Sequence, residues 1–152
     1  MKFSTRQDID APVHAVFEKA TDFPRFERVA RRRGVALTRT ADGNPEGEGT
    51  AWDAAFDYRG KARKVSVCMN QVTPCDYLSM VGKSAGVAYE FNIEFVALSP
   101  SKSRMVVGLE LRPTTLPARL MIQSLKLGKS SLDRKFADGI RKFAEFVKDS
   151  GQ

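Results

Sequence analysis

Apolar side chains recur at helical spacing through the C-terminal part of the chain, from Pro117 to about Asp149. They follow one another at steps of three, four and seven and fall on one side of a helical wheel. This pattern predicts an amphipathic helix roughly 50 Å long, at about 1.5 Å per residue, which needs a broad apolar surface to pack on. The residues of the stripe are Met121, Leu125, Leu132, Phe136, Ile140, Phe143 and Val147.

Two glycines interrupt this predicted helix. Gly128 and Gly139 fall inside the apolar stripe, so we expect each to leave a gap on the buried side. Such a gap indicates close contact with a strand, room for a ligand, or a break in the helix. Ser130 and Asp133 are suited to start a new helix after Gly128.

The N-terminal part of the chain predicts one strand and two short helices. Polar and apolar residues alternate over 2–10, as in a strand with one buried face. Pro12 suits a first helical turn, and apolar residues at helical spacing follow it as far as Ala20. The segment that begins Thr21-Asp22-Phe23-Pro24 predicts a second short helix, with Phe23, Phe26 and Val29 facing inward.

From Gly34 onward the period changes from helical to two, which predicts six further strands. The turns that separate them are expected at 42–47, 59–60, 74–76, 83–86 and 99–103. All these connections are short, so the strands are expected to form an antiparallel meander. The sheet has one polar and one apolar face, and the long C-terminal helix is the element large enough to cover the apolar face. The prediction is one α+β domain spanning residues 1–152.

Composition narrows the class of protein. Hydrophobic residues make up 42% of the 152 residues and charged residues 28%, which excludes disordered, collagen-like and coiled-coil chains. No apolar run approaches the roughly 20 residues that span a bilayer, and the first residues lack the apolar core of a signal peptide, so we expect a cytoplasmic protein. Cys68 and Cys75 are expected to be reduced thiols, because one histidine cannot complete a familiar zinc set with them.

The order of elements resembles the START-like, or SRPBCC, superfamily, whose helix-grip fold is typified by the major birch-pollen allergen. The resemblance covers nearly the whole chain and rests on the opening strand, the stretch 9–17, the stretch Thr21 to Phe26, Val72-Thr73-Pro74, Phe91 to Phe95 and the terminal helix. It implies a curved seven-stranded antiparallel sheet wrapped around the long helix, with a cavity between them. Members bind lipids, sterols, quinones, polyketides or plant hormones, some are aromatase/cyclases or dehydratases, and one branch pairs quinone binding with ribosome association. These are fold motifs, so they supply no catalytic residues.

Inward-facing residues of the sheet and the helix are the predicted ligand-binding set. Aromatic and Met side chains with few polar groups suit a flat or apolar molecule, although the same side chains also suit a filled core. The tyrosine hydroxyls need a partner when buried, so they are favoured to orient a ligand. The set is Trp52, Phe56, Tyr58, Tyr77, Tyr89, Phe91, Phe95, Met105, Met121, Leu125, Leu132 and Phe136, with Thr5, Gln7 and Gln71 as further polar candidates.

Other reactive residue types are expected to face solvent. His14 lies off the apolar stripe of its short helix, which argues against a general base. Lys129 lies at the edge of the long stripe and either reaches water or meets an anionic ligand end. Glu90, Asn92 and Glu94 occupy the polar side of their strand. Glycine-rich phosphate loops are missing, so no cofactor is expected.

The net charge of +7 favours anionic neighbours. The densest cationic cluster is Arg25, Arg28, Arg31, Arg32 and Arg33, which suits either a solubilising surface or a phosphate-rich partner, although no nucleic-acid motif accompanies it. Three functions follow in order of preference: a protein that binds or carries a small hydrophobic molecule, a cyclase or dehydratase, and a protein associated with ribosomes or anionic surfaces. Both a monomer and a homodimer are compatible with the sequence.

Overall fold

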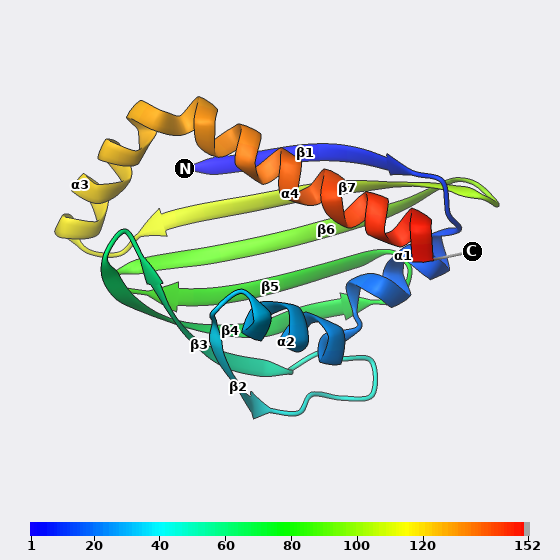
Figure 1. Cartoon of the computed structure of the whole chain (residues 1–152), viewed down its shortest axis with the longest axis horizontal. Helices are drawn as coiled ribbons and strands as arrows, with labels where there is room; N and C mark the ends of the chain where they lie inside the picture. Colours follow the sequence, from blue (N-terminus) through cyan, green and yellow to red (C-terminus); the bar gives the residue numbers. More distant parts are fainter. Residues whose placement is uncertain (151–152) are drawn as a thin grey trace.

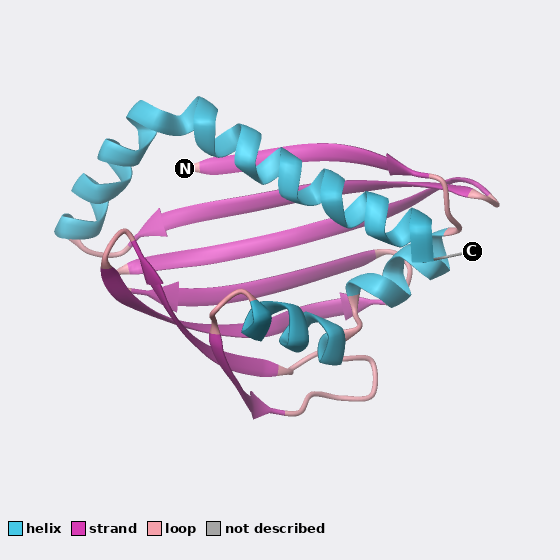
Figure 2. Cartoon of the chain, viewed as in Figure 1, coloured by secondary structure: helices cyan, strands magenta, loops and turns pink. Residues whose placement is uncertain are grey.

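One curved antiparallel sheet of seven strands forms the body of the protein, and the helices lie over one of its faces or at its end (Figure 1). The computed structural model describes residues 1–150. Figure 2 shows the two kinds of element as separate layers. The strands are β1 (Lys2–Ile9), β2 (Ala36–Ala41), β3 (Ala51–Tyr58), β4 (Lys61–Thr73), β5 (Tyr77–Ser84), β6 (Val87–Ser99) and β7 (Lys102–Pro113). The helices are α1 (Val13–Ala20), α2 (Phe23–Arg32), α3 (Leu116–Leu125), a 3-10 turn (Lys126–Gly128) and α4 (Lys129–Ser150).

The predicted meander is confirmed. The strand order is β1-β7-β6-β5-β4-β3-β2 and every neighbouring pair is antiparallel, so only β1 pairs with a strand distant in sequence. Two hairpins close through residues with positive φ, Arg59 and Gly60 between β3 and β4, and Ala85 and Gly86 between β5 and β6. Two consecutive positive φ values are typical of the tight turns whose twist matches that of the strands. The sequence thus gives the correct place for both turns.

The apolar face of the sheet forms the core together with α1 and α4. Strand register brings Ile93 of β6 between Leu78 of β5 and Val107 of β7 on this inner face. Val16 of α1 and Val147 of α4, both fully buried, pack into the same cluster. The predicted division of each strand into an inner and an outer face therefore holds for most of the sheet.

The C-terminal helical run is divided into two helices. The break lies at Gly128, where the sequence left a break as one of three alternatives. The 3-10 turn Lys126–Gly128 separates α3 from α4, and the run changes direction there (Figure 1). The alternative of a break near Gly128 is therefore confirmed, and α4 is the long C-terminal helix, shorter than the roughly 50 Å of an unbroken run. The expected gaps on the buried side were wrong, because Gly128 and Gly139 are exposed and a Cβ at either would meet no atom within 4 Å.

Helix α2 is fastened to the sheet through one carboxylate. Glu27 accepts a hydrogen bond of 2.7 Å from Nε of Arg39 on β2 and one of 2.8 Å from the indole N–H of Trp52 on β3. The Arg39 hydrogen bond is the largest influence and lowers the pKa of Glu27; partial burial opposes it, and the Trp52 N–H adds to the lowering. The rings of Phe23 and Phe26 meet Trp52 edge-on, at centroid distances of 5.2 and 5.5 Å. Helix α2 is thereby held over the inner face at β3.

The β2 strand forms one edge of the sheet and is also bound by α2. Arg31 directs Nε and Nη2 at the carbonyl oxygen of Leu37, at 3.3 and 3.0 Å. The pairing of β2 with β3 shifts register between Arg39 and Ala41, so the end of the strand is irregular. One end of this short edge strand is therefore bound by Arg31, and the other end is irregular.

We predict that Glu27→Gln lowers the free energy of unfolding by about 1–3 kcal/mol, because it removes the charge from a partly buried hydrogen-bonded site. Urea unfolding of the purified variant at pH 7 measures this change. Glu18→Gln on α1 is the matched control, since Glu18 is exposed and its carboxylate makes no ion pair within the described residues. Equal stability of Glu27→Gln and the wild type would contradict the role given to Glu27.

The same pair of proteins tests the lowered pKa of Glu27. A carboxyl whose pKa is lower in the folded state stabilises the fold above its unfolded pKa of about 4.3, and that stabilisation is lost as pH falls through the folded pKa. The stability difference between wild type and Glu27→Gln is therefore expected to be constant near neutrality and to shrink on acidification below about pH 4.3. A difference that grows on acidification would contradict this sign.

Candidate functional site

An apolar hollow lies between the inner face of the sheet and the helices α1 and α2. Its volume is about 120 Å³. Helix α2 forms one wall because the Glu27 hydrogen bonds hold Phe23 and Phe26 against Trp52. Phe26 is nonetheless 40% exposed, which places it where the hollow meets solvent. The lining side chains are Ala20, Phe23, Phe26, Trp52, Met69, Leu78, Met80, Phe91 and Ile93.

A second hollow, of about 230 Å³, lies further along the same face, under α3. One row of the inner face separates the two, because Trp52 pairs with Val67, Val67 with Gly82, and Gly82 with Tyr89. Trp52 borders the first hollow and Tyr89 the second. The side chains that line the second hollow are Phe56, Tyr58, Arg59, Arg63, Val65, Ser84, Ala85, Tyr89, Met121 and Leu125.

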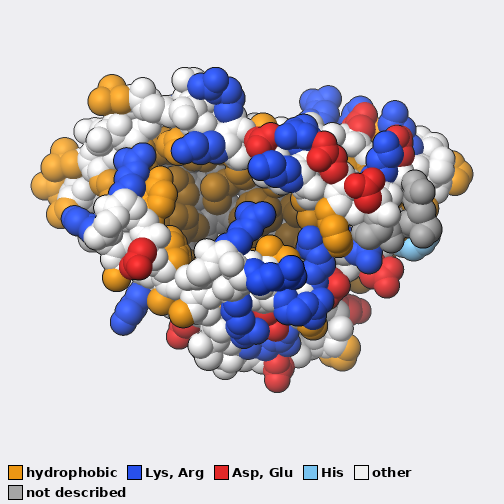
Figure 3. Space-filling model, in the orientation of Figure 1, with side chains coloured by type: hydrophobic (Ala, Val, Ile, Leu, Met, Phe, Trp, Pro, Cys, Tyr) orange, Lys and Arg blue, Asp and Glu red, His pale blue; other side chains and the backbone are white. Residues whose placement is uncertain are grey.

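The space-filling view shows an opening between the C-terminal helices and α2 (Figure 3). Hydrophobic side chains form its floor, and Lys and Arg side chains stand along its rim. The opening therefore leads from a cationic surface to an apolar interior.

The structure divides the predicted ligand-binding residues into three groups. Seven of them line the two hollows: Trp52, Phe56, Tyr58, Tyr89, Phe91, Met121 and Leu125. Others border neither hollow. Phe95 and Met105 are buried in the core, Phe136 packs against it with its ring 6.0 Å from that of Phe3, and Leu132 is half-buried on α4. Their role as ligand contacts stays a prediction.

Tyr77 lies on the opposite face from the one expected. It pairs with the exposed Glu94 of β6, whereas its neighbour Leu78 is buried in the core. The reason is that β5 has apolar residues in both phases, so the alternation did not identify its inner side. Leu78 and Met80 take the inward positions and line the first hollow.

The further polar candidates lie in different places, and none of them borders the two inner hollows. Thr5 and Gln7 border a shallow hollow of about 600 Å³ between β1 and α4, on the inner side of the sheet but away from Trp52. Gln71 is exposed and donates a hydrogen bond of 3.3 Å to Thr73. Lys129 is half-buried and forms an ion pair of 3.0 Å with Asp133. His14 is exposed.

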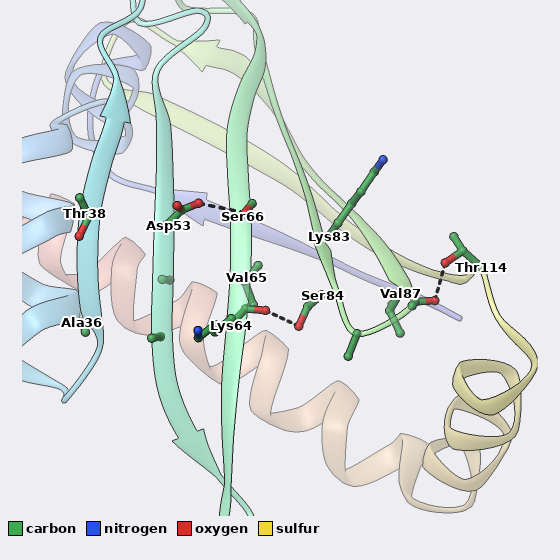
Figure 4. A pocket seen from close by; sticks show the side chains of 14 residues that line it. Ala36, Thr38, Asp53, Lys64, Val65, Ser66, Lys83, Ser84, Val87 and Thr114 are labelled. Atoms are coloured by element: carbon green, nitrogen blue, oxygen red, sulfur yellow. Dashed lines mark hydrogen bonds between the residues drawn. The ribbon is translucent and has the colours of Figure 1, made fainter.

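A hollow of about 700 Å³, larger than either inner hollow, lies on the outer side of the sheet, toward the β5–β6 hairpin. Figure 4 shows its wall, where Ser66 donates to Asp53 at 2.9 Å and Ser84 to the backbone oxygen of Lys64 at 2.6 Å. These polar groups are satisfied by one another, and they stand among Ala and Val side chains, so the cleft is of mixed polarity whereas the first inner hollow is almost wholly apolar. The sequence did not indicate it, because its residues read as an ordinary solvated strand face.

The arginine cluster is partly used within the fold. The guanidinium carbon of Arg25 lies 3.5 Å from the centre of the Phe146 ring, and Arg31 binds the Leu37 carbonyl. Arg28, Arg32 and Arg33 are exposed. The described residues hold no group of three or more metal-binding side chains, and none of their helices is long and apolar enough to span a membrane.

Two charged residues of this region were missed from the sequence, Glu27 and Arg63. Neither is among the residues predicted for the site, although Arg63 shares the phase of Val65, Val67 and Met69, which face inward. The alternation along β4 could therefore have predicted that Arg63 faces inward. For Glu27 the sequence carries no comparable signal, since its partners lie 12 and 25 residues away.

Comparison with known proteins identifies the fold. No protein-family model and no curated protein matches the sequence. Among solved structures, a norcoclaurine synthase from Thalictrum flavum is 12% identical and has a TM-score of 0.71, with 100% of this chain and 96% of that chain covered.

Two further structures share the arrangement. The Zhui aromatase/cyclase from Streptomyces sp. R1128 is 11% identical, with a TM-score of 0.67 over 95% of this chain and 93% of its own. A START superfamily protein from Mycobacterium smegmatis is 12% identical, with a TM-score of 0.58 over 88% of this chain and 95% of its own. The sheet, the two short helices and the C-terminal helices together give this chain the helix-grip fold, which these solved structures share.

Proposed function

We propose that this protein binds a small hydrophobic molecule between its sheet and its helices. The observation that carries the proposal is the apolar hollow of about 120 Å³ at Trp52 and Phe91, which adjoins the hollow of about 230 Å³ at Tyr89 along one row of the inner face. Apolar, concave space of this kind is typical of small-molecule sites. The fold supports the proposal, because proteins that share it bind small molecules of this class.

The chemistry of the first hollow suits an apolar ligand. Its lining carries one polar side-chain atom, the indole nitrogen of Trp52, and that N–H donates to Glu27. A ligand there gains burial of apolar surface, worth roughly 25 cal/mol per Å². Met69 and Met80 are unbranched and polarisable, so they adapt to ligands of different outline. The walls therefore select for apolar character more than for one shape.

A cyclase or dehydratase is the second candidate, and the hydroxyls of Tyr58 and Tyr89 in the second hollow favour it. Two of the solved structures with this fold are enzymes, a norcoclaurine synthase and an aromatase/cyclase. Against it, neither lining includes a His, Asp or Glu among the described residues. General acid–base catalysis most often uses those residue types, so binding is the preferred function.

Association with a ribosome or an anionic surface remains the third candidate. Arg28, Arg32 and Arg33 are available for it on the exposed side of α2 and its end. Arg25 and Arg31 contribute less, because each already contacts its own chain. Binding of that kind weakens steeply with salt, whereas binding in an apolar hollow is nearly indifferent to it.

Filling the first hollow tests the proposal. The neutral fluorescent probe N-phenyl-1-naphthylamine is expected to bind the wild type, and Ala20→Phe is expected to weaken that binding at least about tenfold, because the added ring occupies the space beside Phe23. A fluorescence titration at low and high NaCl measures both the affinity and its salt dependence.

Ala97→Phe is the matched control, since Ala97 is exposed on β6 and borders neither inner hollow. Circular dichroism shows whether each variant is folded. Unchanged probe affinity in a folded Ala20→Phe variant would place the ligand elsewhere, and affinity that falls steeply with salt would favour the third candidate.

Native mass spectrometry of freshly purified protein gives an independent test. We expect a mass above that of the bare chain, lost on collisional activation and recovered as a small apolar compound in an organic extract. Ala20→Phe is expected to carry less of it than Ala97→Phe. Equal loading of the two variants would contradict the assignment of the ligand to the first hollow.

A further inference from the structure

Arg63 lies on the inner face of the sheet, among side chains that are mostly apolar. It pairs with Phe56 of β3, two residues along from the pair of Ala54 and Val65; Ala54 packs on the core and Val65 borders the same hollow as Arg63. Its side chain borders the hollow of about 230 Å³. A strand residue of this phase is normally apolar, so a guanidinium here needs a physical reason.

The guanidinium of Arg63 has an unused donor. Its Nε is buried and has no hydrogen-bond partner, and Arg63 makes no ion pair within the part of the chain described. A buried donor without a partner loses its hydrogen bonds to water and gains none in exchange, which is why such groups are rare in folded proteins. The donor is therefore available to an acceptor that enters the hollow.

No acidic side chain compensates this charge. The lining contains a second arginine, Arg59, and no Asp or Glu. The guanidinium of Arg59 lies over the ring of Tyr58, at 5.4 Å from its centre, and also makes no ion pair within the described residues. The hollow thus carries two positive charges with no counter-charge in its wall, which favours an anion.

The remaining wall is mostly apolar and carries three hydroxyls, of which that of Ser84 already donates to the backbone oxygen of Lys64. Phe56, Val65, Met121 and Leu125 supply carbon surface, while Tyr58 and Tyr89 each carry a phenol group able to donate a hydrogen bond. Tyr58 is 47% exposed, so this hollow opens to solvent on its side. An anionic group entering there meets Arg63, and an apolar body attached to it continues along the inner face toward Trp52.

We infer that the hollow at Arg63 binds the carboxylate end of an amphipathic acid whose apolar part lies along the inner face of the sheet. This inference rests on the proposed function and specifies the class of its ligand. The planar guanidinium fork matches the two oxygens of a carboxylate, and the charge-assisted hydrogen bonds satisfy the buried Nε. Arg59 and the tyrosine hydroxyls add attraction at the mouth.

The test compares two probes that share one chain, decanoate and decanol, by isothermal titration calorimetry. Arg63→Met keeps the length of the apolar stem and removes the charge. Arg119→Met on α3 is the matched control, because Arg119 is exposed, borders neither inner hollow and changes the net charge equally. Thermal unfolding of each variant shows whether it is folded. If Arg63→Met does not fold, Arg63→Gln takes its place.

We expect Arg63→Met to weaken decanoate binding about tenfold to a hundredfold and to change decanol binding by less than about twofold. Arg119→Met is expected to change neither. Decanoate binding unaffected by Arg63→Met, or an equal loss of decanol, overturns the role of Arg63 while leaving the proposed hydrophobic site intact. Tighter binding of decyl phosphate than of decanoate overturns the carboxylate assignment. Failure of both probes to bind any form of the protein overturns the proposed function itself.

Discussion

The hydrogen bond from the Trp52 indole to Glu27 is the contact on which the architecture of the site depends. It joins α2 to β3, and the Arg39 bond to the same carboxylate joins α2 to β2. None of the residues of α2 is fully buried, so its own packing on the sheet is modest. A partly buried carboxylate held by two donors compensates for that, and it keeps Phe23 and Phe26 in place as a wall of the first hollow.

The space inside the protein follows from how the inner face is covered. Helix α4 lies along the β1 side of the sheet, with Val147 and Ala144 buried, and leaves the β2 and β3 side to α2, while α1 lies against β6 and β7. The 3-10 turn at Lys126–Gly128 directs α3 to the end of the sheet, where Ala118 and Ile122 pack near Val87. Separate helical elements thus pack on one curved face of the sheet, and the two inner hollows lie where their coverage of that face is incomplete.

Much of this could be predicted from the sequence, and the exceptions have physical causes. The alternation in β3 and β6 placed Trp52, Tyr89 and Phe91 on the inner face, because those strands have one clearly apolar phase. It failed for Tyr77, since β5 is apolar in both phases. Glu27 and Arg63 were missed for a different reason: a charged residue is read as exposed, and only tertiary contacts show a carboxylate that binds an indole or a guanidinium that faces a hollow.

The β2 edge has a consequence for how this protein meets other chains. A row of unpaired carbonyl and amide groups at the margin of a sheet is a template on which a foreign strand can add. Here the Arg31 fork already occupies the Leu37 carbonyl, and the register shift beyond Arg39 bends the backbone that would follow. Helix α2, which forms a wall of the first hollow, thus also hinders aggregation through strand addition at this edge.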